Sequence, residues 1–286
     1  MIDKNFDVGG AVVFWSIAEW TDRTRLAAKL GELDLQAMVP DPRPAPAALR
    51  SALEDIFGGP RVLIRPLASR DGFAVVQEDR GLAANQYQTL LTSRVTGDPP
   101  TLTFDPWDSR ADLVQGAYQT QLERISAMQV SAVLVRVIDW LAGTRLRPSG
   151  AVYWVPGNRL DDFTHIARAI EDSAEGRPSC VYMLRHRLDN DSIRAIRDAV
   201  VFEVHSEALR IREDVITGTL GTRALETRQR QAADLRAKVL MYEELLSVGL
   251  EGLHQAVDQA DQAAATATLL IGAGACHYAT ASPGAD

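Results

Sequence analysis

Cysteine and clustered histidine are scarce in this 286-residue sequence. The two cysteines, Cys180 and Cys276, are too few for a disulfide framework, so we expect a reduced, cytoplasmic protein. None of the five histidines stands one helical turn from another histidine or beside a pair of cysteines, which are the spacings that zinc sites use. The sequence therefore predicts no metal site and no cofactor.

Long apolar runs are also missing. No stretch approaches the ~20 predominantly apolar residues that a membrane-spanning helix needs, and the first residues lack the basic-then-apolar order of a signal peptide. Hydrophobic residues nevertheless make up 46% of the chain, enough for one large core or two smaller ones. We expect a globular protein without a membrane partner.

Lysine is rare, and negative charge outweighs positive charge. The formal net charge is -8, and all but three of the 30 basic residues are arginine. Affinity for nucleic acid depends largely on neutralising phosphates, so the negative net charge argues against a protein that binds nucleic acid over most of its surface. It does not exclude binding through a local basic patch. Arginine suits bidentate contacts with carboxylate or phosphate, although a GC-rich coding sequence produces the same bias. We regard coding bias as the simpler explanation.

Motifs that carry chemistry are absent as well. The sequence contains neither type of glycine-rich phosphate loop, and Val8-Gly9-Gly10-Ala11 precedes a predicted strand instead of following one. It also lacks the G-x-S-x-G motif that presents a nucleophilic serine, and its cysteines and histidines do not form the motif of an enzyme family with a catalytic cysteine. Asp105 and Asp108 lie close together, but acids just before a helix are typical of an N-terminal cap. Whether the protein is an enzyme is uncertain, and the missing motifs argue against it.

The clearest pattern present is an apolar period of about 3.5 residues that persists for about four heptads between Leu225 and Leu253. Such a period keeps one seam of a helix facing a partner, as in a coiled coil. Arg228 stands in this seam and would need a carboxylate partner if it is buried. We take the seam as a candidate protein interface. Its residues are Leu225, Arg228, Leu235, Val239, Tyr242, Leu246 and Leu253.

A second periodic run, from Ile193 to Val215, precedes this seam. Gly218-Thr219-Leu220-Gly221 separates the two runs, and glycine just past a periodic run indicates a helix end. The two runs predict a long antiparallel helical hairpin over residues 190–264, whose second arm continues to about residue 262 and projects past the first. The alternative is that each helix packs separately on the rest of the protein.

Charge gives a partial test of this hairpin. If the turn is centred near residues 219–220, several opposite charges should face each other across the two arms. Such pairs set register more than stability, at ~0.2–1 kcal/mol each. The predicted pairs are Arg194 and Arg197 with Glu243 and Glu244, and Glu203 with Arg236.

The rest of the chain predicts an α+β body. Residues 1–106 form an α+β region with helices near residues 22–31 and 46–57, separated by a proline-rich connector, and an antiparallel meander joined by turns such as Asp71-Gly72. Residues 107–189 form a helical stretch to about residue 142 followed by a strand–helix–strand unit. Residues 265–286, rich in small residues without a period, are expected to be a disordered tail. The meander strands are expected at residues 62–67, 73–77, 88–95 and 101–104.

One basic and aromatic group could bind an anion. If the strands at 151–156 and 180–184 pair in parallel, arginines gather at their carboxyl ends, where open sheets bind ligands, and the aromatic pair could stack a base. The simpler alternative is that the arginines pair internally with nearby aspartates. The candidate ligand-binding residues are Arg145, Arg147, Tyr153, Trp154, Arg159, Arg185, His186 and Arg187.

These observations favour a non-enzymatic interaction or assembly protein that uses its C-terminal hairpin to bind itself or a partner protein. The alternative is a nucleic-acid or nucleotide-phosphate binding protein that uses the arginine and aromatic patch. A third hypothesis is an enzyme whose site is assembled from residues scattered along the sequence.

Overall fold

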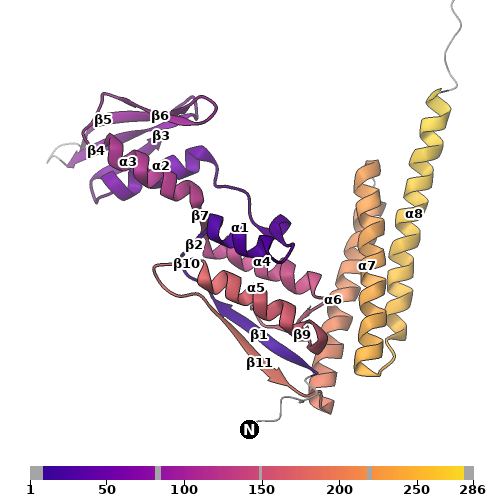
Figure 1. Ribbon diagram of the computed structural model, residues 1–286. Coiled ribbons are helices and arrows are strands. Elements are labelled where there is room, and N and C mark those ends of the chain that lie inside the picture. The colour runs from indigo at the N-terminus through magenta and orange to yellow at the C-terminus, as the bar shows by residue number, and fades with distance from the viewer. Residues whose placement is uncertain (1–8, 81–84, 148–149, 218–220, 280–286) are drawn as a thin grey trace, which may run out of the picture. The chain divides into compact units, whose positions relative to one another are not determined.

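The computed structural model describes residues 9–80, 85–147, 150–217 and 221–279 (Figure 1). It divides into two compact units, one made of residues 1–15, 138–163 and 182–286, the other of residues 16–137 and 164–181. The two units group the chain differently from the boundaries predicted at residues 106 and 189, because strands that are distant in sequence share one sheet. The fold is α+β with antiparallel sheets, as predicted.

The larger sheet of the second unit is the predicted meander. Strands β3 (Val62–Pro66), β4 (Gly72–Arg80), β5 (Asn85–Thr96) and β6 (Thr101–Asp105) pair antiparallel in chain order. Helices α2 (Ala45–Phe57) and α3 (Ala111–Glu123) lie together on one side of it (Figure 1). Leu49, Leu53, Val75, Leu91 and Tyr118 fill the space between helices and sheet with no exposed surface.

The turn between β3 and β4 shows why glycine stands at its end. A Cβ on Gly72 would lie 2.1 Å from the carbonyl oxygen of Ser93 on the neighbouring strand, so no larger residue fits. Arg70 takes the positive φ of 58° in this turn. The Asp-Gly signal therefore predicted the hairpin correctly, with Asp71 accepting a hydrogen bond from Arg94 across the strands.

The same unit contains a small three-stranded sheet that the sequence did not predict. Strand β2 (Trp20–Asp22) lies between β10 (Ala174–Glu175) and β7 (Arg124–Ser126). Strand β7 interrupts the helical stretch predicted from residue 109 to residue 142, which is instead α3 and α4 (Ala127–Trp140). The unit also contains α1 (Arg23–Gly31) and the short 3-10 helix η1 (Gln36–Met38). Asp22 caps α1 by accepting from the Arg25 amide at 2.8 Å.

The first unit is built on a four-stranded sheet in the order β11-β1-β9-β8. Its strands are β1 (Gly10–Ser16), β8 (Thr144–Arg145), β9 (Tyr153–Pro156) and β11 (Cys180–His186). The 3-10 helix η2 (Gly157–Arg159) and helix α5 (Leu160–Asp172) follow β9 along the chain. Strand β9 is antiparallel to β1. Phe14 stacks on Tyr182 whereas Gly9 lies against Leu188, so β11 also runs antiparallel to β1.

The predicted strand–helix–strand unit is therefore present, but the direct parallel pairing of its two strands, on which the anion-binding hypothesis depended, does not occur. Strands β9 and β11 point the same way, and β1 lies between them. Along the chain these strands and the helices between them follow in the order β1, α4, β8, β9, α5 and β11. When the four strands are numbered by this chain order, they lie side by side in the sheet as the fourth, first, third and second strand. The first and third strands in chain order, β1 and β9, therefore form the centre of this sheet, and β11 and β8 form its edges.

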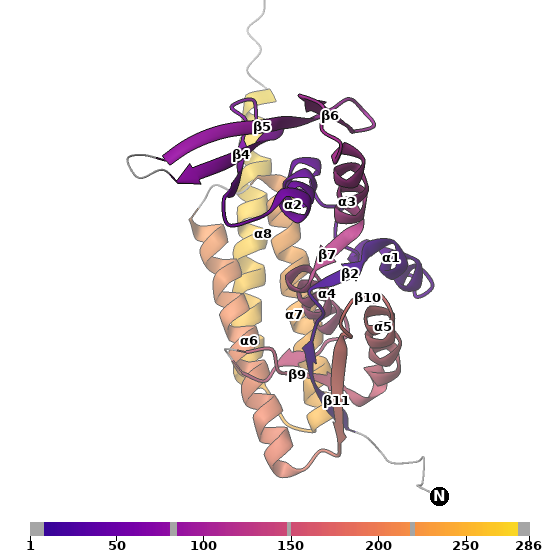
Figure 2. The same ribbon diagram turned by 90° about the vertical axis from the view of Figure 1, so that its left-hand side faces the viewer.

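Three C-terminal helices complete the first unit. Helices α6 (Asn190–Ile216), α7 (Thr222–Leu246) and α8 (Glu251–Ala279) lie side by side (Figures 1 and 2). The first two form the predicted hairpin. The second arm does not continue to residue 262, because Ser247 takes a left-handed conformation with φ of 50° that ends α7, and α8 then folds back. Residues 265–279, predicted to be disordered, belong to α8, and residues 280–286 lie outside the described part.

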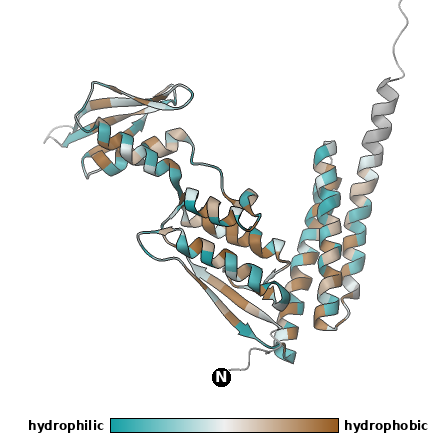
Figure 3. Cartoon of the chain, viewed as in Figure 1, coloured by the Kyte–Doolittle hydropathy of each residue, from teal (hydrophilic) through white to brown (hydrophobic). Residues whose placement is uncertain are grey.

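Packing of these helices explains their periodicity. Figure 3 shows hydrophobic and hydrophilic residues alternating along α6 and α7. The hydrophobic positions of α6, α7 and α8 form one cluster with Trp154 of the sheet, so the helices share a core with the sheet. Trp154 is fully buried and its ring centroid lies 5.8 Å from that of Tyr242 on α7. The helical region is thus part of the first unit's body.

Candidate interaction surface

The predicted anion-binding residues do not converge on one site. Tyr153 and Trp154 alternate along β9, so their side chains lie on opposite faces of the sheet, and they are only 4% and 0% exposed. Neither ring has a free face for a base. The nucleic-acid hypothesis therefore loses its stacking pair and keeps only arginines.

Trp154 and His186, which lie on different strands, are brought together across β1. The indole Nε1 of Trp154 donates a hydrogen bond to His186 Nε2 at 3.2 Å. His186 Nδ1 lies 2.9 Å from the carbonyl oxygen of Arg187, so Nδ1 carries the proton in this arrangement. The indole can cross the intervening strand only because Gly10 has no side chain, since a Cβ there would lie 2.4 Å from the ring. The hydrogen bond between Trp154 and His186 therefore holds a buried side chain in the core, and it does not form part of a ligand-binding site.

The arginines of the patch are distributed among separate partners. Arg145 donates to the Tyr153 hydroxyl at 3.1 Å and lies over its ring. Arg159 pairs with Asp162 at 3.3 Å and lies over the ring of Trp140, in line with the alternative of internal pairing. Arg147, Arg185 and Arg187 are exposed, Arg185 within β11 and Arg187 just past its end.

The predicted seam is buried within the chain itself. Arg228 meets the carboxylate it was expected to need, since its Nη2 lies 2.7 Å from Asp214 of α6. The other seam residues are 0–8% exposed and therefore present no surface to a second molecule. They are Leu225, Leu235, Val239, Tyr242, Leu246 and Leu253.

Helix α8 changes the predicted charge pairs between the hairpin arms. Arg236 pairs with Asp258 at 2.7 Å and Asp261 at 3.2 Å, both on α8, instead of with Glu203. Glu243 accepts hydrogen bonds from the Leu250 amide and from His254. Arg194 and Arg197 pair locally, with Asp191 and Asp198. The predicted pairs between the two arms are therefore not formed: Arg236 and Glu243 find partners on α8, and Arg194 and Arg197 find theirs within α6.

One cluster of titratable groups attaches the hairpin to the sheet. Lys238 of α7 donates to Glu203 of α6 and, at 2.7 Å, to the carbonyl oxygen of Gly143. Glu203 also accepts from the Thr144 hydroxyl at 2.6 Å. Tyr242 donates to the carbonyl oxygen of Ala142 at 2.9 Å, and burial raises the pKa of this tyrosine, with a smaller effect from Glu203.

This cluster resembles a catalytic arrangement in composition only. The Lys238 side chain is 11% exposed, and its ammonium is held by Glu203 and Gly143. The Tyr242 hydroxyl is likewise engaged, so neither group can reach a substrate. We assign the hydrogen bonds of Lys238, Glu203 and Tyr242 to fixing the position of the hairpin on the sheet.

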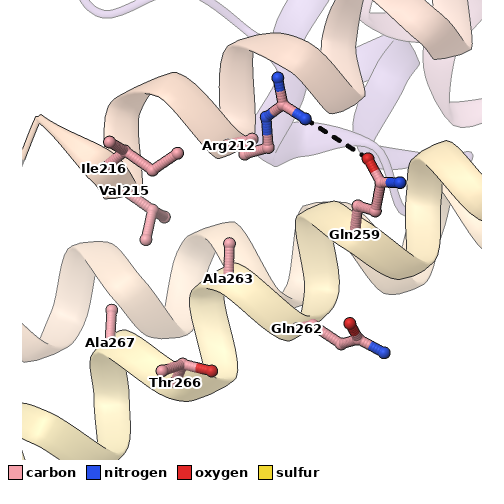
Figure 4. A pocket seen from close by; sticks show the side chains of 8 residues that line it. All are labelled: Arg212, Val215, Ile216, Gln259, Gln262, Ala263, Thr266 and Ala267. Carbon is pink, nitrogen blue, oxygen red and sulfur yellow. Dashed lines mark hydrogen bonds between the residues drawn. The ribbon is translucent and has the colours of Figure 1, made fainter.

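A groove does lie between α6 and α8 (Figure 4). It has a volume of about 510 Å³ and is open to solvent. Arg212 of α6 donates across it to the Gln259 side chain at 3.3 Å, while its Nε is buried and has no partner among the described residues. Its lining is mostly small or amide side chains, which suits close approach of another helix better than binding of a small molecule. The other lining residues are Val215, Ile216, Gln262, Ala263, Thr266 and Ala267.

Helix α6 carries a second apolar row on the side away from its own core. Phe202, Leu209 and Ile216 recur every seven residues, which is about two helical turns, so they follow one line along the helix. Phe202 is 59% exposed, Ile216 is 70% exposed and Leu209 is half-buried. Ile216 also lines the groove. We call these three residues the outer ridge.

Comparison with known proteins identifies the family. The model of a family of unknown function, DUF6744, matches residues 9–274. The chain belongs to DUF6744. No curated protein and no solved structure matches it. The matched stretch runs through both compact units.

Two further findings concern the described residues of this DUF6744 chain. They contain no group of three or more His, Cys, Asp or Glu residues that could hold a metal ion. They also contain no helix that is both long enough and apolar enough to span a bilayer. On the described part of α6, the exposed residues of the outer ridge adjoin the groove of Figure 4.

The sequence contains a signal for the outer ridge, a seven-residue apolar repeat, which is weaker than the apolar repeat of the buried side of α6. The row Phe202, Leu209 and Ile216 repeats at seven residues, but polar His205 and Arg212 stand between its members. The stronger apolar run on the opposite side of the same helix therefore dominated the pattern. Exposure, which only the structure supplies, separates the two sides.

Proposed function

We propose that the protein is a non-enzymatic interaction protein that binds a helix of another polypeptide on the outer ridge of α6. The observation that carries this proposal is that α6 has two apolar sides, and the described residues of its own unit cover only one of them. Ile196, Val200 and Val204 are at most 1% exposed, whereas Phe202 and Ile216 are more than half exposed. Exposed apolar side chains in a row on a helix are typical of helix-in-groove recognition.

The adjoining groove supports the same proposal. A helix lying against the outer ridge would also contact the small residues of α8, and Ala263 and Ala267 permit close approach of two backbones. Gln259, Gln262 and Thr266 supply a polar rim. A fourth helix at this place would complete a four-helix bundle with α6, α7 and α8.

The proposal is tested by capture of partners from an extract of the source cells. The bait is compared with Phe202→Asp/Ile216→Asp and with Leu240→Asp, a control on α7 whose side chain is 54% exposed and lies off the ridge. We expect specific partners to be lost with the ridge variant and retained with the control. Partners retained by the ridge variant, or lost equally with both variants, would contradict the proposal.

A further inference from the structure

The groove between α6 and α8 carries a positive charge (Figure 4). Among the described residues that line it, Arg212 is the only charged one, and the others are apolar, hydroxyl or amide side chains. The chain as a whole has a formal net charge of -8. Because a guanidinium stays protonated in proteins, the groove is a positively charged place on an acidic protein, and its electrostatic complement on a partner is negative.

Arg212 has no carboxylate partner in the described chain, unlike three other arginines of the same helices. Arg210, Arg228 and Arg236 each contact at least one aspartate or glutamate. Arg212 instead donates one hydrogen bond of 3.3 Å to the Gln259 side chain. Its Nε is buried and finds no acceptor among the described residues. A buried donor without an acceptor costs free energy, so an incoming acceptor at Arg212 would be stabilised.

The guanidinium can turn toward a ligand at small cost. In the single chain its Nε edge is covered, so a carboxylate that binds this edge requires a rotation of the side chain. Among the described residues, the hydrogen bond that this rotation breaks is the exposed one to Gln259, which is longer than the usual range. Once turned, the guanidinium offers two parallel N–H groups to the two oxygens of a carboxylate, a strong bidentate arrangement.

We propose that the partner helix carries an acidic residue, aspartate or glutamate, within its apolar stripe, and that this carboxylate binds Arg212. The inference rests on the proposed function, because it names the chemistry of the helix that covers the outer ridge. Ile216 belongs to the ridge and also lines the groove, one helical turn after Arg212. A helix that packs against the ridge therefore brings its side chains over Arg212.

The spacing on α6 fixes where the acid stands in the partner helix. Leu209, Arg212 and Ile216 follow one another at three and four residues, so they lie in one row along α6. A helix packed along this row contacts it with residues at the same spacing, because the two helices have the same pitch. The acid should therefore be flanked by apolar residues three or four positions away on both sides.

The test is a selection from a display library of helical peptides of about 18 residues, long enough to cover the ~21 Å from Phe202 to Ile216. The bait is the full chain, and one side of the peptide helix is randomised. We expect the selected peptides to carry the flanked Asp or Glu. With Arg212→Gln as bait this acid should no longer be selected, and with Arg212→Glu a Lys or Arg should take its place. Arg230→Gln, at an exposed arginine of α7 outside the groove lining, is the matched control and should select the same acid as the wild-type chain.

The affinity of one selected peptide gives a second readout, measured by fluorescence anisotropy. Replacing the acid of the peptide by its amide should weaken binding to the wild-type chain about tenfold or more, because the guanidinium loses a charged acceptor. The same replacement should weaken binding to Arg212→Gln by less than about twofold. Since Arg212→Gln should still bind the amide peptide, the comparison separates loss of this contact from loss of folding.

Three results would overturn the inference. Two are selected peptides that lack the acid, and an acid that Arg212→Gln selects equally well. The third is a ridge covered by another copy of the chain, seen by light scattering as a doubled mass that Phe202→Asp/Ile216→Asp reduces to one chain.

The same selection separates this inference from the proposed function. If the selected peptides lack the acid but fail to bind Phe202→Asp/Ile216→Asp, the inference fails while the proposed function stands. If the peptides bind this variant as well as the wild-type chain, or no helical peptide is selected, both fail.

Discussion

Both sides of α6 carry apolar residues, every three or four residues on the inner side and every seven on the outer side, but only the inner side is buried among the described residues. On the inner side Ile196, Val200, Val204, Ala208 and Ile211 are at most 2% exposed and share a core with α7, α8 and Trp154. On the outer side Phe202 and Ile216 are exposed. Periodicity tells which residues share a side of a helix, but it does not tell which molecule covers that side.

The two sides also differ in how polar groups are used. On the inner side the Lys238–Glu203 pair is bound to Thr144 and to a backbone carbonyl, so it fixes the hairpin against the sheet. On the outer side Asp198 and Arg212 have weak or incomplete partners. Satisfied polar groups specify one arrangement, whereas incompletely satisfied ones are available for a partner.

The largest loss of stability is expected from truncating Trp154, the buried side chain that joins the sheet to the inner side of the helices. Trp154→Ala deletes a fully buried ring that joins the sheet to α7, and we expect a loss of about 3–5 kcal/mol in the free energy of unfolding. Urea denaturation followed by circular dichroism measures it. Trp107→Ala, at a tryptophan that is 71% exposed, is the control and should change stability by no more than about 0.5 kcal/mol. Equal effects of the two substitutions would contradict the assignment of Trp154 as anchor.

A smaller effect is expected from breaking the ion pair that fixes the hairpin. Removing one partner of a fully buried pair costs about 3–5 kcal/mol, and because the Glu203 side chain is 30% exposed we expect about 2 kcal/mol for Lys238→Met. The double variant Lys238→Met/Glu203→Met should be more stable than Lys238→Met alone, because it leaves no unpaired carboxylate. A double-mutant cycle by urea denaturation tests this, and strictly additive losses would show that the two groups act independently.

The outer side should tolerate substitution that the inner side does not. Phe202→Asp is expected to change the free energy of unfolding by no more than about 0.5 kcal/mol, since the side chain is 59% exposed. Val204→Asp, two residues away on the inner side, places a charge in the core and should cost about 3 kcal/mol or more. Thermal unfolding of both variants compares the two sides directly. A large loss with Phe202→Asp would mean that the chain itself uses the ridge.

Much of the fold followed from local patterns in the sequence. The strands β3 to β6 were predicted correctly, and the apolar period identified the buried side of α7 as far as Leu246, because spacing and turn residues are local signals. The break at Ser247 was missed because a serine in a left-handed conformation has no distinctive sequence signature, and only Gly249 nearby weakened the helix. Strand β7 is three residues long, too short to interrupt a helical pattern.

Features that depend on distant residues could not be predicted. Strand β1 lies between β9 and β11, and the sequence gives no sign of which strands pair across more than a hundred residues. The contact of Trp154 with His186 depends on Gly10, which belongs to the strand between them. The aromatic pair Tyr153 and Trp154 was expected as a possible ligand platform, and its burial follows from which elements cover each face of the sheet.

The smallest effect is expected at the connection between α7 and α8, where pH provides the perturbation. The Glu243 carboxylate accepts from the Leu250 amide at 2.7 Å and from His254 at 2.9 Å, and these hydrogen bonds lower the pKa of Glu243. Because the folded-state pKa is depressed, the contribution of this carboxylate is present above its ordinary pKa and is lost as pH falls through the lowered value. Hydrogen exchange of the Leu250 amide should therefore show protection near neutral pH that declines in acid. In Glu243→Gln the protection should be weaker at neutral pH and nearly independent of pH, so an unchanged pH dependence in this variant would place the titrating group elsewhere.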